Sequence, residues 1–461
     1  MEKMMDRCGL FGMFDNNGFH TSHLIYYGLF SMQHRGMEAA GICVNDNQGN
    51  FSYVKDEGLV TEVFDEMKLE KLQGHAGIGH ILRYDGSDAR ENAQPIVIRY
   101  TNGHMAVALN GGLTNIEEIR HDLELKGSVF QTMEAAEVIS VLISRARNNY
   151  PTIEEAIASI MPMLKGGYAM LVMTPRKVIG VRDPQGIRPL VLGREDHSWF
   201  LSSETCAFDE LNVDYVRDIQ PGEIVVINAE GPHSIQGMPA QPIRACIYEY
   251  IYYSHPASVF GGQEVYKARY NMGCHLAKEA PADADAVVWV PDSGLAAAAG
   301  YADTRGIPMV DAFVKNKYYG NNLVKPEGIL FDRKIHMKLS VIKSQVKDKN
   351  IVVVDDSMVR GTTAQTLVEL LRHAGAKSVH LRIASATISH PCYYGASMPE
   401  EKKAGAEYYL NLSVQLKEDT EWAKAGADSL AFLSSEGMVA ACPDAAGGFC
   451  MACFNGDYPT K

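Results

Sequence analysis

The segment that most constrains the fold lies at residues 351–363 and reads IVVVDDSMVRGTT. Four β-branched apolar residues at 351–354 predict a strand buried on both faces, and the apolar spacing that begins at Ala364 predicts a helix. A loop between such a strand and helix offers backbone N–H groups to a phosphate. Asp355 and Asp356 would stand at the carboxyl end of the strand, where open α/β sheets bind ligands. The segment therefore predicts a phosphate-binding loop with two acids that face the hydroxyls of a sugar.

The sequence around this segment alternates between strand and helix patterns. Apolar runs at 286–290 and 309–314 predict two further strands, and residues 295–301 predict a helix between them. Alternation of this kind is typical of a parallel sheet covered by helices. The second half of the chain is therefore expected to be an α/β domain.

The first half has a different pattern. Short strand-like runs occur at 105–109, 169–172 and 223–227, and helical spacing occurs near 133–147 and 153–162. This mixture predicts layered β-sheets flanked by helices, an α+β architecture. A stretch rich in Gly, Pro and Gln at residues 230–244 separates the halves, so we expect one domain at 8–235 and another at 245–461.

Composition excludes several classes of protein. The chain has 461 residues and a formal net charge of -13, and it contains no basic stripe with interleaved aromatic residues, which argues against a nucleic-acid surface. No apolar run approaches the roughly 20 residues of a membrane span. The first seven residues are too few and too polar for a secretory signal, so a cytoplasmic enzyme of two or three domains is expected.

The charge reverses locally at residues 311–350, which hold nine Lys or Arg against four Asp or Glu. A basic segment directly before a phosphate-binding loop suits a lid over an anionic substrate. From charge alone, an ordinary solvated surface segment explains the same composition equally well.

The full pattern of residues 351–363 resembles the diphosphate-sugar signature of type I phosphoribosyltransferases. A bare pair of acids is common at turns, so the resemblance depends on the whole pattern. It implies that Asp355 and Asp356 bind the ribose hydroxyls and, with Ser293, place Mg2+ on the pyrophosphate. The 5-phosphate would be held by the loop residues Ser357, Arg360, Gly361, Thr362 and Thr363.

Cys8 begins a second resemblance. The run Cys8-Gly-Leu-Phe-Gly and the later run Gln33-His34-Arg35-Gly36 are similar to glutamine amidotransferases of the N-terminal-nucleophile class. In that class the mature chain begins at a cysteine whose thiolate attacks the glutamine amide, and the α-amino group, with a pKa of roughly 7.7–8.0, assists as a base. The resemblance implies that residues 1–7 are removed as a propeptide. A lone cysteine is otherwise more often a buried core thiol.

Nearly the whole chain resembles, in order, a family that joins such a glutaminase domain to a type I phosphoribosyltransferase domain. The resemblance implies glutamine-dependent formation of 5-phosphoribosylamine from phosphoribosyl pyrophosphate, the first step of de novo purine synthesis. It also implies inhibition by purine nucleotides and a homo-oligomer, specifically a homotetramer. Further matching stretches are 166–169, 182–190, 203–205, 291–294 and 337–340.

The cysteines provide a separate argument. Cys450 and Cys453 form a Cys-x-x-Cys pair, and Cys246 and Cys392 stand where iron-sulfur members of the family carry one cysteine each. Four thiolates suit a [4Fe-4S] cluster or a tetrahedral zinc ion, and a lone Cys-x-x-Cys can also be a redox pair. The resemblance favours the cluster, in a structural or regulatory role. We expect the remaining cysteines besides Cys8 to be ordinary thiols: Cys43, Cys206, Cys274 and Cys442.

The glutamine site departs from the family pattern. Asn110 and Gly111, the pair that would donate to the oxyanion, are present, although Gly112 follows where relatives have Asn. Ala135 stands at the position of the aspartate that receives the α-amino group of glutamine. Arg83 is the candidate for the α-carboxylate, within a segment that differs from the usual Arg-Tyr-Ser-Thr.

The sequence is therefore compatible with three functions. Cys8, Asn110 and Gly111 favour a working glutamine-dependent enzyme. Ala135, and Asn321 in place of a usual lid arginine, favour a divergent paralogue that uses free ammonia or only binds the sugar diphosphate as a regulator. A phosphoribosyltransferase for another acceptor is the third.

Overall fold

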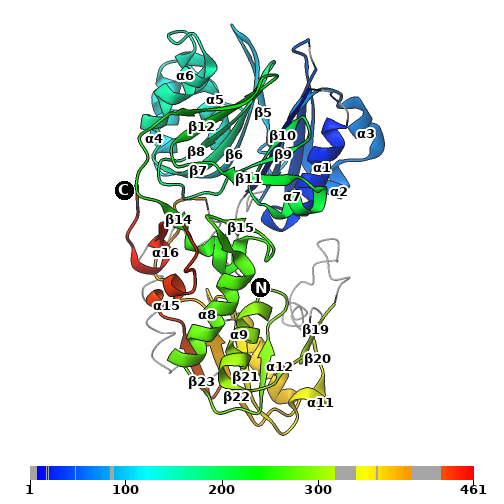
Figure 1. Ribbon diagram of the computed structural model, residues 1–461, viewed down its shortest axis with the longest axis vertical. Helices are drawn as coiled ribbons and strands as arrows, with labels where there is room; N and C mark the ends of the chain where they lie inside the picture. The colour runs from blue at the N-terminus through cyan, green and yellow to red at the C-terminus, as the bar shows by residue number, and fades with distance from the viewer. Residues whose placement is uncertain are drawn as a thin grey trace.

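The computed structural model describes residues 8–16, 18, 20–46, 48–83, 88–316, 339–359, 362–395 and 427–460. These residues form two lobes joined by a layer of short elements (Figure 1). Residues 1–7, Asn321, Arg360 and Gly361, for which sequence predictions were made, lie outside the described residues.

Two antiparallel sheets form the upper lobe in Figure 1. The first has the order β11-β9-β10-β1-β4-β2-β3, with strands Asp214–Asp218, Val191–Glu195, Ser198–Ser202, Cys8–Asp15, Ala76–Leu82, Ala39–Asn45 and Phe51–Glu57. The second has the order β13-β12-β8-β7-β6-β5, with strands Gly231–Gln236, Glu223–Asn228, Lys177–Arg182, Gly166–Thr174, Gly103–Leu113 and Ile96–Tyr100.

Helices cover the outer faces of both sheets. The period-2 alternation of a strand explains this layering, because Leu10 and Phe14 of β1 pack between the sheets while Phe11 and Met13 pack on the helical side. On the first sheet lie α1 (Thr21–Ser31), α2 (Val60–Val63), α3 (Glu66–Lys71) and α7 (Cys206–Leu211), and on the second lie α4 (Ile116–Leu125), α5 (Ala135–Ala146) and α6 (Ile153–Ile160). The predicted layered α+β domain is therefore present.

A five-stranded parallel sheet forms the lower lobe, in the order β18-β17-β21-β22-β23. Its strands are Met309–Val310, Ala286–Trp289, Asn350–Asp355, Ser378–Ile383 and Ser429–Phe432. In β21, Val352 and Val354 pack toward α8 (Val265–Glu279) and α9 (Leu295–Arg305), whereas Ile351 and Val353 pack toward α12 (Thr362–His373). The run 351–354 is thus buried on both faces, as predicted.

Two sequence predictions need correction. The apolar run 309–314 is not one strand, because β18 belongs to the parallel sheet while β19 (Phe313–Lys315) pairs with β20 (Leu339–Val341) in a separate ribbon. The stretch 230–244 is not a continuous linker either. Its first part is β13, which pairs along its whole length with β12, because backbone pairing overrides the weak strand propensity of Gly and Pro.

Short elements join the two lobes. Strand β14 (Arg244–Cys246) pairs in parallel with β24 (Gly448–Cys450), and η3 (Glu249–Tyr253), a π-helix, follows β14. One hydrophobic core cluster runs from the upper lobe through this layer into the lower lobe. The layer is completed by β15 (Val259–Phe260), β16 (Gln263–Glu264), α15 (Ser435–Ala440) and α16 (Ala452–Asn455), while α11 (Lys343–Val346) follows β20.

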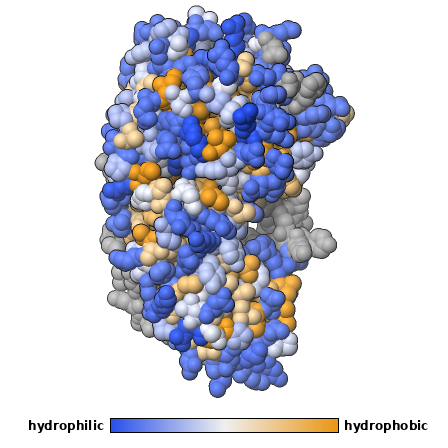
Figure 2. All heavy atoms as spheres, in the orientation of Figure 1, coloured by the Kyte–Doolittle hydropathy of each residue, from blue (hydrophilic) through white to orange (hydrophobic). Residues whose placement is uncertain are grey.

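The face drawn in Figure 2 is mostly hydrophilic. Figure 2 shows hydrophobic residues on one face in small scattered groups among hydrophilic ones. Among the described residues, no helix combines the length and apolar character that a membrane crossing requires.

Candidate functional site

A cavity of about 330 Å3 lies beside the first residue of β1, where the upper lobe meets the joining layer. Cys8 lines it, and the Cys8 side chain is 4% exposed. Cys8 is held in the sheet opposite Leu82 of β4, and the Nε of Arg35 donates a hydrogen bond to its carbonyl oxygen at 3.1 Å. Residues of the upper lobe and of the joining layer complete the lining, including Arg83, Leu109, Gly111, Ala135, Pro391, Cys392, Tyr393 and Gly395.

The predicted oxyanion pair lies on β6, and of its two residues Gly111 lines this cavity whereas Asn110 does not. Gly111 lines the cavity and has a φ of 127°, and a Cβ added there would lie 2.1 Å from the carbonyl oxygen of Gly167, so only glycine fits. The Asn110 side chain is fully buried, and neither polar atom of its amide has a hydrogen-bond partner among the described residues. Buried amides are normally hydrogen-bonded, so this unsatisfied amide is an exception among the described residues.

The walls of the cavity carry charges of both signs. Arg83, the candidate for the glutamine α-carboxylate, lines it, with its Nη1 3.7 Å from Oε1 of Glu38. Ala135 lines it too and begins α5, so the position where the family has an aspartate does face this space.

Sequence reasoning missed a second acid at the same wall. Glu134, directly before Ala135, lines the cavity, and its Oε2 accepts a hydrogen bond from Nε2 of Gln94 at 3.0 Å. Gln94 is itself fixed, because its Oε1 accepts from the backbone N–H of Leu109 at 2.8 Å. In the sequence, Glu134 could be noticed only as an acid next to Ala135. The direction of its side chain is set by its position as the N-cap residue of α5.

In the lower lobe, the sugar-site candidates meet at the carboxyl ends of adjacent parallel strands. Asp355 ends β21, and Ser293 lies in the turn after β17. The turn packs closely on β21, because a Cβ added at Gly294 would lie 2.6 Å from the carbonyl oxygen of Val354. Oxygen ligands gathered at this edge are of the type that Mg2+ prefers.

Asp356 and Ser357 are buried just beyond the strand. The Ser357 hydroxyl donates to Oδ1 of Asp356 at 2.5 Å, and the backbone N–H of Asp356 donates to Oδ1 of Asp355 at 2.9 Å. A small cavity is lined by Ser293, Asp356 and Arg269, an arginine that sequence reasoning did not single out. Thr362 and Thr363 are the first two residues of α12, so the helix begins two residues before the predicted start at Ala364.

Four cysteines from three segments border one small internal cavity of the joining layer: Cys246, Cys392, Cys450 and Cys453. Pairing of β14 with β24 sets Cys246 opposite Cys450. Burial raises the pKa of the Cys450 thiol to about 12 and holds the pKa values of Cys246 and Cys453 well above their usual range. These thiols are therefore protonated without a metal, and metal binding would have to displace their protons.

Over the described residues, no group of three or more His, Cys, Asp or Glu side chains is arranged to hold a single metal ion. A zinc ion binds thiolates at about 2.3 Å, which requires tightly gathered sulfurs. Among the described residues, the structure brings the four cysteines to one cavity but shows no arranged metal site there.

Comparison with protein families agrees with this two-lobed arrangement. Residues 82–210 match the glutamine amidotransferase domain, and residues 264–405 match the phosphoribosyl transferase domain. The fold and the two sites thus define a protein of the class that joins an N-terminal-nucleophile glutaminase domain to a phosphoribosyltransferase domain, which confirms the expected fold class.

Individual relatives narrow this class to one family. The chain is 40% identical over 465 residues to the amidophosphoribosyltransferase of Bacillus subtilis, covering 99% of this chain and 94% of the relative. It is 40% identical over 477 residues to that of Methanocaldococcus jannaschii, covering 98% of each. The structure of the B. subtilis glutamine phosphoribosylpyrophosphate amidotransferase complexed with ADP and GMP matches with a TM-score of 0.90 and 40% identity, covering 98% of both chains. The chain belongs to the amidophosphoribosyltransferase family.

Proposed function

We propose that this protein catalyses glutamine-dependent formation of 5-phosphoribosylamine from phosphoribosyl pyrophosphate, the first step of purine synthesis. Family membership over nearly the whole chain supports the proposal. The observation that carries it is the cavity in which Cys8, Arg83 and Gly111 meet. A regulator that had lost glutamine chemistry would have no need to keep a nucleophile, an anion-binding arginine and an oxyanion glycine around one space.

In the glutamine reaction, the Cys8 thiolate attacks the side-chain carbonyl carbon of glutamine. The Asn110 amide and the Gly111 backbone N–H donate to the oxyanion that forms, which is where preorganised donors lower a barrier most. Ammonia leaves with a proton from the α-amino group of Cys8, and water then hydrolyses the thioester to glutamate. This role of the α-amino group requires removal of residues 1–7, which stays a prediction.

In the phosphoribosyl reaction, ammonia displaces pyrophosphate from the anomeric carbon. Asp355 and Asp356 hold the ribose hydroxyls, and the loop from Ser357 through Arg360 and Gly361 to Thr362 and Thr363 holds the 5-phosphate. Bound through Ser293, Asp355 and Asp356, Mg2+ would neutralise charge on the pyrophosphate. The chain's own contribution is to position the ribose so that ammonia can approach the anomeric carbon in line with the departing group.

We assign binding of the glutamine α-amino group to the Glu134 carboxylate. It would take the place of the aspartate that the family has where this chain has Ala135. Glu134 lines the cavity with Arg83, and Gln94 orients its carboxylate. We expect Glu134→Gln to raise the KM for glutamine about tenfold or more, since a charge-assisted hydrogen bond contributes about 1.5–3 kcal/mol. Steady-state kinetics with glutamine and with ammonium would measure this, and the ammonium-dependent rate should not change.

Glu117→Gln is the comparison variant for this prediction, because Glu117 also lines the cavity. An increase in KM in Glu117→Gln with none in Glu134→Gln would show that the ammonium group is bound at the other wall and would refute the assignment to Glu134.

The cofactor proposal is a [4Fe-4S] cluster held by Cys246, Cys392, Cys450 and Cys453. Anaerobically purified protein is expected to contain about four iron and four sulfide per chain, and Cys453→Ser is expected to lower both. Cys442→Ser is the matched control, since Cys442 is a buried thiol that does not line the four-cysteine cavity. Wild-type protein with zinc, or with neither iron nor sulfide, would contradict the proposal.

Further family properties are proposed with the activity. The solved B. subtilis relative is complexed with ADP and GMP, which supports inhibition of this enzyme by purine nucleotides. Homotetramer formation, a cytoplasmic location and domain limits of 8–235 and 245–461 stay predictions.

Pyrophosphate release from phosphoribosyl pyrophosphate and Mg2+ tests the function directly, with glutamine or ammonium as the nitrogen donor. Turnover with glutamine is the expected result. Turnover with ammonium alone would favour the ammonia-dependent paralogue, and no turnover with either donor would favour a binding protein or a transferase for another acceptor.

A further inference from the structure

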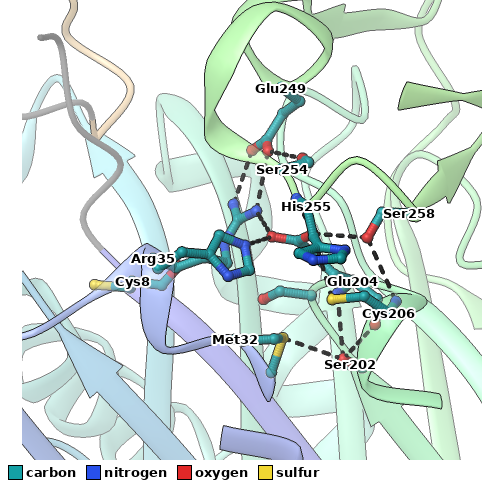
Figure 3. A network of polar contacts seen from close by, with 12 residues as sticks. Cys8, Met32, Arg35, Ser202, Glu204, Cys206, Glu249, Ser254, His255 and Ser258 are labelled. Carbon is teal, nitrogen blue, oxygen red and sulfur yellow. Dashed lines mark hydrogen bonds and ion pairs between the residues drawn. The ribbon is translucent and has the colours of Figure 1, made fainter. Parts of the chain in front are cut away.

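A buried carboxylate of the joining layer is bound by two arginines of the upper lobe. Glu249, the first residue of η3, is 3% exposed, and Arg35 of the upper lobe grips it with two nitrogens, Nη1 at 3.0 Å and Nη2 at 2.9 Å (Figure 3). Arg188 donates to it from Nη1 at 3.2 Å, and the Ser254 hydroxyl donates at 2.6 Å. Burial alone would raise the pKa of Glu249, but Arg35 and Arg188 hold it below its usual range, so the carboxylate is ionised.

The first arginine leads to the nucleophile. Besides binding Glu249, Arg35 donates from Nε to the backbone carbonyl oxygen of Cys8 at 3.1 Å, and Figure 3 draws both residues. Arg35 is fully buried, so its guanidinium has little freedom to move without its acceptors. Glu249 therefore helps to set the position of the backbone that carries the attacking thiol.

The second arginine leads to the oxyanion glycine. Arg188 donates from Nε and Nη2 to the carbonyl oxygen of Tyr394 at 3.0 and 2.8 Å. The next residue, Gly395, packs directly on the strand of the oxyanion pair, since a Cβ added at Gly395 would lie 2.5 Å from the carbonyl carbon of Gly111. A shift of the Tyr394 backbone would therefore press on Gly111 or leave it unsupported.

We propose that Glu249 is a positioning residue for the glutamine reaction. One carboxylate from the joining layer holds both halves of the reacting geometry in register, the nucleophile through Arg35 and the oxyanion glycine through Arg188 and Gly395. The inference rests on the proposed glutamine hydrolysis. It goes beyond it by assigning a role in that reaction to a residue that does not line the glutamine cavity.

A second buried acid, Glu204, also binds Arg35, so the fold should survive the loss of the Glu249 charge. Oε1 of Glu204 accepts from Nη1 of Arg35 at 2.6 Å, and its Oε2 accepts from the Ser258 hydroxyl at 2.7 Å. Burial would raise the pKa of Glu204, but His34 and Arg35 hold it well below its usual range. Arg35 therefore keeps an ionised partner when the charge of Glu249 is removed.

The test compares Glu249→Gln with Glu223→Gln in the holoenzyme. Glu223 is matched in environment, since it is 4% exposed, paired with Arg217 at 2.6 and 2.9 Å and bonded to the Ser234 hydroxyl at 2.5 Å. Glu249→Gln is expected to lower kcat with glutamine about 10- to 100-fold, the effect of a small misplacement of reacting groups. Its KM for glutamine and its ammonium-dependent rate should stay within about twofold, and Glu223→Gln should change neither activity.

Several results would overturn the inference: an unchanged kcat with glutamine, an equal loss with both nitrogen donors, or the same selective loss in Glu223→Gln. If Glu249→Gln does not fold, Glu249→Asp keeps the charge but is too short to reach both arginines, and it should show the same selective loss. Wild-type kcat with glutamine in Glu249→Asp would also refute the inference.

The rate at which a chloroketone analogue of glutamine alkylates Cys8 separates this inference from the proposed function. We expect Glu249→Gln to slow alkylation at least about tenfold. A wild type that alkylates but does not turn over glutamine would refute the proposed function alone. Equal alkylation rates in wild type and Glu249→Gln would refute the positioning role alone.

Discussion

Cys8→Ala is expected to abolish glutamine-dependent pyrophosphate release while ammonium-dependent release continues at close to the wild-type rate. The nucleophile is lost, so the glutamine-dependent rate should fall at least about 1000-fold. The phosphoribosyl site depends on strand ends of the other lobe and should not be affected. Pyrophosphate release with each nitrogen donor measures both activities.

Cys43→Ala is the matched control for this variant. Cys43 is also a buried thiol of the same sheet, on β2, and burial raises its pKa far above the usual range, so it is an inert core residue. It does not line the glutamine cavity. Glutamine turnover that persists in Cys8→Ala, or that vanishes in Cys43→Ala, would be inconsistent with Cys8 as the nucleophile.

Asp355→Asn is expected to have the complementary effect, a loss of about 100-fold or more in pyrophosphate release with both nitrogen donors. The change removes a negative charge that would bind the ribose hydroxyls and Mg2+ at the carboxyl end of β21. Alkylation of Cys8 by the chloroketone should proceed at the wild-type rate. The two variants together would assign each half-reaction to its own lobe.

Asp285→Asn is the control, because Asp285 contacts the opposite end of β21. Oδ2 of Asp285 accepts from the backbone N–H of Asn350, the first residue of β21, at 2.8 Å, and an asparagine oxygen can accept the same bond. Activity should therefore be retained in Asp285→Asn. A loss in this variant equal to that in Asp355→Asn would indicate damage to β21 rather than loss of a ligand.

Features that depend on short segments could be predicted from the sequence. The run 351–354 needs only its own β-branched residues to indicate a strand buried on both faces, and the strand at 350–355 agrees with it. The same holds for α5 and β12, whose predicted ranges differ from the observed ones by a few residues at most. The prediction of one strand at 309–314 was wrong, because the division of this run between two sheets depends on partner strands elsewhere in the chain.

The candidate sites divide in the same way. Cys8 and the acid pair at 355–356 could be proposed from local patterns, and the structure places Cys8 at the glutamine-site cavity and Asp356 at the small cavity of the lower lobe. Glu134 was missed, because only the packing of α5 against β6 shows that the residue before Ala135 lines the glutamine cavity.

The sequence by itself determined the order and type of the main elements, and it predicted the nucleophile and the sugar-binding loop, because each depends on residues adjacent in the chain. Tertiary structure alone decided which distant segments meet at the joining layer. Arg35 and Glu249 lie 214 residues apart in sequence, and Cys246 reaches Cys450 only through the pairing of β14 with β24. Such contacts form because burial in a shared core makes unpaired charges and unpaired backbone costly, and that condition exists only once the lobes have packed.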